Sequence, residues 1–329
     1  MDKTKEFELS CEVCKSRRIS FLFSNRDRMF LKMKGNFDLY QCDNCGLITI
    51  YPKPNSIKLS DHYSKNYSVY SDSGGIKYFR KIYTLLETIY HYSYVKYDLS
   101  IFLKIIHLFF IPMRSFFRTT RVIEGGNFLD VGCGVGYFLL VMKLLEMNPY
   151  GVEPGEFDEN LSKEYGLKIS HCDLFEANYK DAFFDVITLN HVLEHTPNPS
   201  EIMGELNRIL KKEGYLIIGV PINDCLAFSV FGKRWAQIDT PRHLYIFSRN
   251  SLIMLAEKNG FEIVNIRYNS NPTYQIVCSI KYTLEKFAKK KINYDFTNNI
   301  VLNLIFLPVS AFLNLIKKGD QCEIILKKE

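Results

Sequence analysis

The stretch FLDVGCGVGYFLL, residues 128–140, decides the fold class. An apolar run ends in Asp130, breaks into three glycines at alternate positions (Gly132, Gly134 and Gly136) and then turns apolar again. This order predicts a strand, a tight turn and the start of a helix, because glycine lets the backbone turn sharply and approach a ligand closely. The turn could bind a nucleotide-like cofactor, or it could serve only to pack strand against helix.

The segments that follow alternate between short apolar runs and longer helical patterns. The clearest helical stretch is SEIMGELNRILKKEG at 200–214, with Ser200 placed to cap its start and Gly214 just past its end. Such alternation predicts an α/β, Rossmann-like sheet that is mostly parallel and covered on both faces. The strands expected in this part are 127–131, 149–153, 167–170, 184–190 and 215–220.

The C-terminal part departs from this alternation. FEIVNIRY at 261–268 and CEIILKK at 322–328 both have a strand pattern, although a long and largely helical segment lies between them. We expect them to pair as antiparallel neighbours around a helical insertion at about 272–320. The result would be a seven-stranded sheet whose last strand is antiparallel.

The whole chain has the composition of a folded globular protein. Its 329 residues are 47% hydrophobic and 24% charged, which excludes a disordered chain. The formal net charge of +6 permits an anionic partner without requiring one. The N-terminus, MDKTKEFELS, has no apolar signal region, and the nine cysteines are odd in number. We therefore expect a reducing, cytoplasmic setting in which paired cysteines bind metal.

Acidic residues mark the ends of the first three expected strands. Asp130 lies at the end of the first, Glu153 ends the second, and Asp173 follows the third. In an open parallel sheet the ligand lies beyond these strand ends, where a helix N-terminus offers N–H groups. Glu153 is placed to accept ribose hydroxyls, with a loop-capping role as the alternative, and Asp173 could reach an adenine amino group. Several carboxylates would repel a pyrophosphate, so a cofactor with a positive centre is favoured over a dinucleotide.

The segments FLDVGCGVGYFL, GVEPG, HCDLFE, FDVITLNHVLEHTPNP and RILKKEGYLIIGVP resemble, in order and spacing, the class I S-adenosylmethionine-dependent methyltransferases. The resemblance covers roughly residues 120–270. It implies that the glycine turn cradles the methionine end of the cofactor, that Glu153 holds the ribose and that Asp173 meets the adenine. The residues expected to bind S-adenosylmethionine are Asp130, Gly132, Gly134, Gly136, Glu153, Asp173 and Asn190.

Two Cys-x-x-Cys pairs, Cys11 with Cys14 and Cys42 with Cys45, precede this region. Four thiolates form a closed tetrahedral Zn²⁺ site, and Gly46 after the second pair allows a tight knuckle. We expect this zinc to stabilise the fold without taking part in chemistry; four free thiols are the alternative. The region resembles the N-terminal zinc ribbon of a methyltransferase subgroup, several of whose members act in sugar or surface-polysaccharide pathways. Similar ribbons occur on ribosomal RNA methyltransferases, so the ribbon alone does not identify the acceptor.

Two segments supply candidates for the acceptor side. NHVLEH, after the fourth strand, places His191 and His195 one helical turn apart. His191 could act as a general base or could bond to a nearby loop, and a metal-binding pair is a weaker alternative. WAQIDTPRHLYIFS, at 235–248, is expected to form a loop over the pocket, where His243 or Tyr245 closes the acceptor site. The predicted catalytic residues are thus His191, His243 and Tyr245.

Two strongly apolar stretches, 99–113 and 300–316, are shorter than a membrane-spanning helix requires. We expect buried helices, with contact to a membrane surface or a lipid-linked substrate as the alternative. The predicted organisation is a zinc ribbon at 1–60, a helical linker or cap at 61–121 and a methyltransferase domain at 122–329.

These features predict a cytoplasmic methyltransferase for a small-molecule acceptor, most specifically a sugar nucleotide or glycan precursor of surface polysaccharide. A lipid-linked acceptor would place the protein at the periphery of the inner membrane face. RNA is disfavoured as an acceptor because the basic patches are modest. A non-catalytic binding module is disfavoured by the intact glycines and acids. The oligomeric state and the methylated atom are not predicted.

Overall fold

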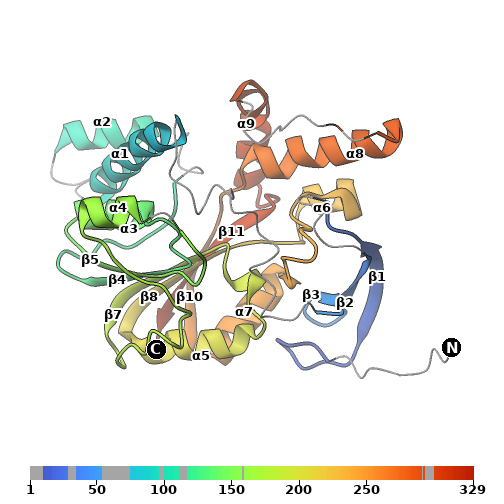
Figure 1. Ribbon diagram of the computed structural model, residues 1–329, viewed down its shortest axis with the longest axis horizontal. Helices are drawn as coiled ribbons and strands as arrows, with labels where there is room; N and C mark the ends of the chain where they lie inside the picture. Colours follow the sequence, from blue (N-terminus) through green and yellow to red (C-terminus); the bar gives the residue numbers. More distant parts are fainter. Residues whose placement is uncertain are drawn as a thin grey trace.

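A seven-stranded sheet forms the centre of the protein (Figure 1). The computed structural model describes residues 10–28, 35–53, 75–95, 100–110, 117–157, 159–290, 292 and 300–329. The strand order is β10-β11-β8-β7-β4-β5-β6. The strands are β4 (Asn127–Val131), β5 (Asn148–Val152), β6 (Lys168–Ser170), β7 (Phe184–Asn190), β8 (Leu210–Pro221), β10 (Phe261–Tyr268) and β11 (Gln321–Lys328).

The direction of the strands confirms the predicted sheet. β4, β5, β6, β7 and β8 pair in parallel with one another, whereas β11 is antiparallel to both of its neighbours, β8 and β10. The register joins Phe261 to Lys328 and Tyr268 to Cys322, so the two C-terminal runs are neighbours, as expected. Helices cover both faces of this sheet, and strands buried on both faces have the continuous apolar sequence seen in β7.

Helices α1 (Gly75–Val95), α3 (Tyr137–Leu144) and α4 (Asn160–Tyr165) lie above the sheet in Figure 1, and α5 (Pro199–Ile209) and α7 (Arg249–Lys258) lie below it. α5 corrects the predicted helix at 200–214 because it ends at Ile209. β8 begins at the next residue, where Leu210 pairs with Phe184 of β7. Strand pairing therefore overrides the helical pattern of the last residues.

The described part of the predicted helical linker or cap at 61–121 is only partly helical. It contains α1 and α2 (Ile101–Phe110), while residues 117–121 run without helix into β4. Most of the proline-containing connector that begins at Tyr51 falls outside the described residues, as do 96–99 and 111–116.

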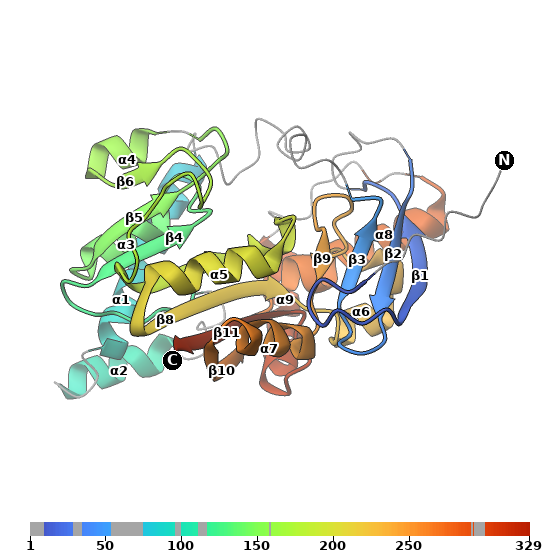
Figure 2. The same ribbon diagram turned by 90° about the horizontal axis from the view of Figure 1, so that it is seen from below.

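The cysteine-rich region forms a second sheet with the order β1-β2-β3-β9. Its strands are β1 (Ile19–Asn25), β2 (Phe37–Cys42), β3 (Ile48–Tyr51) and β9 (Tyr245–Ile246). β9 comes from the loop after β8, and it pairs antiparallel with β3 through Ile48 and Thr49. Apolar residues of this sheet share one core with β7, β8 and α5, so the two sheets are packed together (Figure 2).

Three further helices are α6 (Leu226–Phe231), α8 (Cys278–Ala288) and α9 (Ile300–Leu315). α6 shares a core with the second sheet, α8 contacts α6, and α9 contacts β10 at the edge of the central sheet. The expectation that the two apolar stretches are buried is wrong. Large apolar side chains are exposed along both α2 and α9, which lie above the sheet in Figure 1. In the described part of the chain, no helix combines the length and hydropathy needed to cross a membrane. The exposed residues are Ile101, Phe102, Ile105, Leu108 and Phe109 of α2 and Val301, Leu304, Ile305, Val309, Phe312 and Leu315 of α9.

Candidate active site

The glycine turn connects β4 to α3 in the predicted way. Gly132, Gly134 and Gly136 have φ angles of 70°, 53° and 93°, a region that side chains disfavour. Gly136 caps the start of α3, and the first N–H groups of this helix have no partner within the helix. Cys133 fills space against Gly151, and burial raises the pKa of its thiol well above the usual value. Cys133 is therefore a packing residue in its thiol form.

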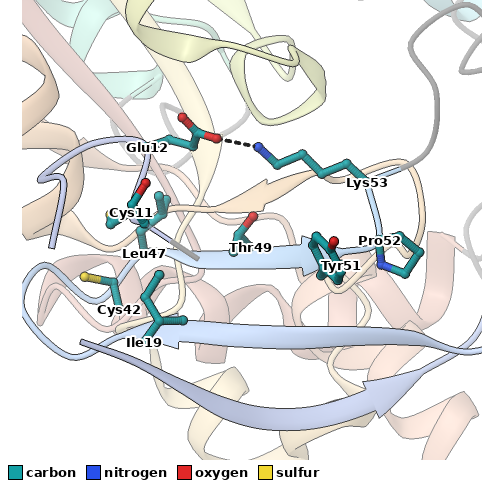
Figure 3. Close-up of a pocket in the computed structure, with 10 residues that line it drawn as sticks. Cys11, Glu12, Ile19, Cys42, Leu47, Thr49, Tyr51, Pro52 and Lys53 are labelled. Atoms are coloured by element: carbon teal, nitrogen blue, oxygen red, sulfur yellow. Dashed lines mark hydrogen bonds and ion pairs between the residues drawn. The ribbon is translucent and has the colours of Figure 1, made fainter. Parts of the chain in front are cut away.

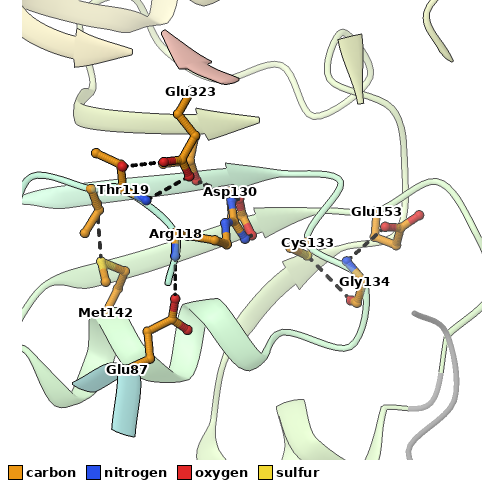
Figure 4. A network of polar contacts seen from close by, with 11 residues as sticks. Glu87, Arg118, Thr119, Asp130, Cys133, Gly134, Met142, Glu153 and Glu323 are labelled. Carbon is orange, nitrogen blue, oxygen red and sulfur yellow. Dashed lines mark hydrogen bonds and ion pairs between the residues drawn. The ribbon is translucent and has the colours of Figure 1, made fainter. Parts of the chain in front are cut away.

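Glu153 lies just past the end of β5 and bonds to this turn. Its Oε2 accepts the N–H of Gly134 at 3.0 Å, and its Oε1 accepts the N–H of Gly155 at 2.8 Å (Figure 4). Burial raises the pKa of Glu153, and these two N–H bonds oppose the shift. The carboxylate is thereby fixed at the rim of the turn, with lone pairs left to accept hydroxyl groups.

Asp173 has a local partner in this structure. Its Oδ1 accepts the N–H groups of Phe175 and Glu176 at 2.8 and 2.9 Å, so the exposed carboxylate caps the turn that follows β6. Asn190, at the end of β7, lies against Gly219 of β8. An added Cβ at Gly219 would come within 2.4 Å of Asn190 Oδ1, so the glycine leaves room for this side chain.

Asp130 is engaged by the protein itself. Its two oxygens accept hydrogen bonds from Arg118 Nη1 and Nη2 at 3.0 and 2.6 Å, and Thr188 Oγ1 adds a third at 2.6 Å. The Asp130 side chain is only 1% exposed. In this structure the carboxylate is therefore part of a buried ion pair, and the expected contact of Asp130 with the cofactor stays a prediction. Sequence analysis missed Arg118, which lies between α2 and β4 in the segment predicted to be helical.

The ion pair is part of a polar network between α1 and the sheet (Figure 4). Glu87 of α1 accepts the backbone N–H of Arg118 at 2.9 Å, and Glu323 of β11 accepts the N–H of Thr119 at 2.9 Å. Burial raises the pKa of Glu87 to about 7. This network fastens the segment before β4 to the middle of the sheet.

The loop after β7 brings His191 to the glycine turn. His191 has a positive φ of 56° and donates its backbone N–H to Gly219 at 2.8 Å. The next residue, Val192, packs where a Cβ on Gly132 would lie, with 2.4 Å between the two positions. A non-glycine residue held in this conformation is strained, and such strain is concentrated at functional sites.

Three histidines lie around Glu194, which belongs to the short 3₁₀ helix Leu193–His195. His191 Nδ1 lies 3.1 Å from Glu194 Oε1, His243 Nε2 lies 4.0 Å from the same oxygen, and the rings of His195 and His243 are 4.8 Å apart. Burial opposes protonation of His191, but the Glu194 carboxylate outweighs it and raises the pKa of His191. Burial also opposes ionisation of Glu194, yet His191 and the other two histidines lower its pKa to about 2. The structure thus brings His191 and His243 to one carboxylate.

Tyr245 lies outside this cluster, and its expected catalytic role stays a prediction. It is fully buried in β9, and its hydroxyl bonds to Pro197 O at 2.8 Å and to Lys53 Nζ at 2.7 Å. Arg242 is also buried in this segment, where it forms ion pairs with Asp239 and with Asp27 of the cysteine-rich region. The segment expected to form a loop over the pocket is largely buried where the two sheets meet.

The four predicted metal ligands come together. Cys11 and Cys45 have sulfurs 3.4 Å apart, Cys14 and Cys42 have sulfurs 3.5 Å apart, and all four sulfurs lie within 4.8 Å of one another. Zinc–sulfur bonds of about 2.3 Å would separate tetrahedral sulfurs by roughly 3.8 Å, so the group fits a zinc ion. Gly46 takes the predicted positive φ of 77°, and Lys15 does the same in the first knuckle with 60°.

A cavity of about 420 Å³ lies beside this cysteine cluster (Figure 3). Cys11 and Cys42 line one part of it, and the ion pair of Glu12 with Lys53, at 2.7 Å, crosses its mouth. The cavity lies on the ribbon, whereas the glycine turn lies at the end of β4. We therefore assign it no part in cofactor binding.

Residues 109–266 match the family model of the methyltransferase domain. The sheet order, the glycine turn and the acid at the end of β5 agree with this match and give residues 109–266 the class I methyltransferase fold. These findings indicate an S-adenosylmethionine-dependent methyltransferase.

Curated relatives include quinone-pathway enzymes. The chain is 26% identical over 168 residues to the ubiquinone biosynthesis O-methyltransferase of Shewanella pealeana, covering 46% of this chain and 71% of the relative. It is 32% identical over 110 residues to the demethylmenaquinone methyltransferase of Listeria monocytogenes, covering 30% and 46%. Among solved structures, an S-adenosylmethionine-dependent methyltransferase from Archaeoglobus fulgidus matches with 24% identity and a TM-score of 0.41, covering 62% of this chain and 86% of that one.

Proposed function

We propose that the enzyme holds the methionine end of S-adenosylmethionine on the glycine turn, with the ribose on Glu153 and the adenine near Asp173. The observation that carries this proposal is the fixed carboxylate of Glu153 beside positive-φ glycines at the N-terminus of α3. The first N–H groups of α3 suit the cofactor's carboxylate. The remaining lone pairs of Glu153 suit two ribose hydroxyls.

Methyl transfer from a sulfonium requires alignment of the attacking atom and, for a neutral nucleophile, removal of a proton. His191 is placed for the second task. It is half-buried, its Nδ1 is oriented by Glu194, and it follows the last residue of β7. With Nδ1 donating to the carboxylate, Nε2 is the nitrogen that accepts a proton from the acceptor.

The acceptor that we propose is a small, hydroxyl-bearing molecule, most specifically a sugar nucleotide or glycan precursor. The zinc ribbon supports this choice through its resemblance to the ribbons of sugar-pathway methyltransferases. Carboxylate and imidazole groups such as Glu194, His191 and His195 are suited to bond hydroxyls. The named relatives belong to quinone pathways, so their names give no support to a sugar.

A lipid-linked acceptor is a second candidate, favoured by the exposed apolar faces of α2 and α9. Neither helix contains an acidic residue. Exposed lysines lie near the two ends of the segment that contains α9, and such a combination suits an anionic bilayer surface. These lysines are Lys286, Lys289, Lys290, Lys317 and Lys318. Lys291, next to Lys290 in the sequence, lies outside the described residues.

We also propose that the four-cysteine group binds one structural zinc ion. The sulfur separations support it, and a site closed by four thiolates leaves no position for substrate. Zinc would here hold the two knuckles together and so fix the start of β1 and the end of β2.

The cofactor assignment is tested by calorimetric titration of Glu153→Gln with S-adenosylmethionine. Loss of charge-assisted hydrogen bonds worth about 1.5–3 kcal/mol each should weaken binding by tenfold or more. Glu156→Gln is the matched control, because Glu156 is exposed three residues further on. Equal affinity of Glu153→Gln and wild type would refute the ribose assignment.

The acceptor is identified by supplying radiolabelled S-adenosylmethionine with soluble sugar nucleotides or with lipid-linked sugars in anionic vesicles. Label in the soluble sugars supports the first candidate. Label only in the vesicle lipid supports the second.

A further inference from the structure

Glu194, His195 and His243 form a compact group that the cofactor assignment does not use. Each offers one ligand atom, a carboxylate oxygen or an imidazole nitrogen, and these atoms lie within 4.8 Å of one another. Glu194 and His195 come from the short helix after β7, whereas His243 comes from the segment before β9. Residues far apart in the sequence are therefore held at one point beside the glycine turn.

The hydrogen bonds of the two histidines assign their tautomers. His195 Nδ1 lies 2.9 Å from the carbonyl oxygen of Arg242, and His243 Nδ1 lies 2.8 Å from that of Gln237. A carbonyl oxygen can only accept, so Nδ1 carries the proton in both rings, and Nε2 has the lone pair. Metal-binding histidines are oriented in this way, with the outer N–H donated to a backbone carbonyl or carboxylate.

Glu194 supplies an independent observation. Its side chain is fully buried, and its Oε1 accepts from His191 Nδ1 at 3.1 Å. Its Oε2 is also buried and finds no hydrogen-bond partner in the described part of the chain. Moving a carboxylate oxygen from water to a buried position without a hydrogen-bond partner costs on the order of several kcal/mol of free energy. Such an atom is therefore expected to contact a bound group.

We propose that Glu194, His195 and His243 bind a divalent first-row transition-metal ion through one carboxylate oxygen and two Nε2 atoms. Two imidazoles and one carboxylate are a ligand set suited to such ions. His191 acts as a positioning residue, because its bond to Oε1 fixes the orientation of the Glu194 carboxylate, and the same oxygen lies 4.0 Å from His243 Nε2.

Three protein ligands leave at least one coordination position open. Glu194 and His243 are buried, whereas His191 and His195 are half-buried. The group is therefore accessible from the side on which His191 and His195 lie. The open coordination position of the metal ion binds an oxygen atom of the acceptor. The acceptor is therefore a hydroxyl-bearing molecule. This last step rests on the proposed function, whereas binding of the metal does not.

The probe is Co²⁺, titrated by calorimetry and absorption spectroscopy into full-length protein whose four-cysteine group is loaded with zinc. Cobalt bound to thiolates has strong sulfur-to-metal absorption, and cobalt bound to nitrogen and oxygen does not, so the two sites are told apart. We expect about one cobalt per chain without the thiolate absorption.

Two variants remove ligands, and a third is the control. Glu194→Gln and His195→Gln should each weaken cobalt binding by at least roughly tenfold. His107→Gln, which removes a histidine on α2, should leave the affinity unchanged. His195 is half-buried, so its variant provides the test if Glu194→Gln fails to fold.

Absence of a cobalt site without thiolate absorption in wild type would overturn the proposal, as would equal affinity in both ligand variants. The titration needs neither S-adenosylmethionine nor an acceptor. Failure of the Glu153 test therefore leaves this result unaffected, and the two proposals fail separately.

Discussion

The buried ion pair between Asp130 and Arg118 allows the structural role of Asp130 to be measured. Asp130→Asn keeps the shape of the side chain but removes the charge that faces both guanidinium nitrogens and Thr188 Oγ1. Breaking a buried pair by removing one partner costs about 3–5 kcal/mol. The Arg118 side chain remains 22% exposed and can be partly hydrated, so we take the lower value, about 3 kcal/mol. The ratio of folded to unfolded protein should then fall by roughly a hundredfold.

Urea unfolding followed by circular dichroism and by the fluorescence of Trp235, the single tryptophan, measures this loss. The double variant Asp130→Leu/Arg118→Met should recover most of the stability, since apolar replacement of a buried pair is often neutral. Asp181→Asn is a matched control, because Asp181 pairs with Arg208 at the exposed surface and should matter by less than about 1 kcal/mol. If Asp130→Asn unfolds like Asp181→Asn, the ion pair does not stabilise the fold, and Asp130 returns to the candidates for cofactor contact.

Two further predictions concern the ribbon and pH. Cys42→Ser/Cys45→Ser should lose about one zinc per chain in metal analysis and should unfold at lower urea; a folded, metal-free wild type would contradict the zinc assignment. Burial raises the pKa of Asp320 from 3.8 to about 6, so the folded state keeps this proton where the unfolded chain has lost it. Stability contributed by this group is therefore present at low pH and is lost as pH rises from about 4 to about 6. Asp320→Asn should reduce the change of the urea unfolding midpoint with pH in this range. If the midpoint of the variant changes with pH as steeply as that of wild type, another group titrates.

The central sheet could be predicted because its determinants are local. The apolar runs of β4, β7 and β10 and the positive-φ glycines after β4 each specify their own backbone. The end of α5 could not be predicted in the same way. Residues 210–214 continue the helical pattern of charge, but pairing with β7 draws them into β8.

Glu153 and His191 follow the strand ends at which the sequence places them, and their roles in the site stay predictions. Contacts with partners remote in the sequence could not be predicted. Arg118 captures Asp130 from a segment without motif, and Tyr245 is taken into the ribbon sheet by pairing of β9 with β3. The exposure of apolar side chains on α2 and α9 could not be predicted either. An apolar sequence does not show whether a helix packs against the rest of the protein or leaves its apolar side chains exposed.

The strand β9 also has a consequence for the order in which the protein is made. The cysteines and β1 to β3 leave the ribosome early, but the edge of β3 stays open until Tyr245 and Ile246 have been synthesised. During translation the nascent chain must hold an unpaired strand edge, which is an aggregation hazard. Early capture of zinc would protect this intermediate by ordering the knuckles before their last strand arrives. The metal would then serve the growing chain as well as the finished enzyme.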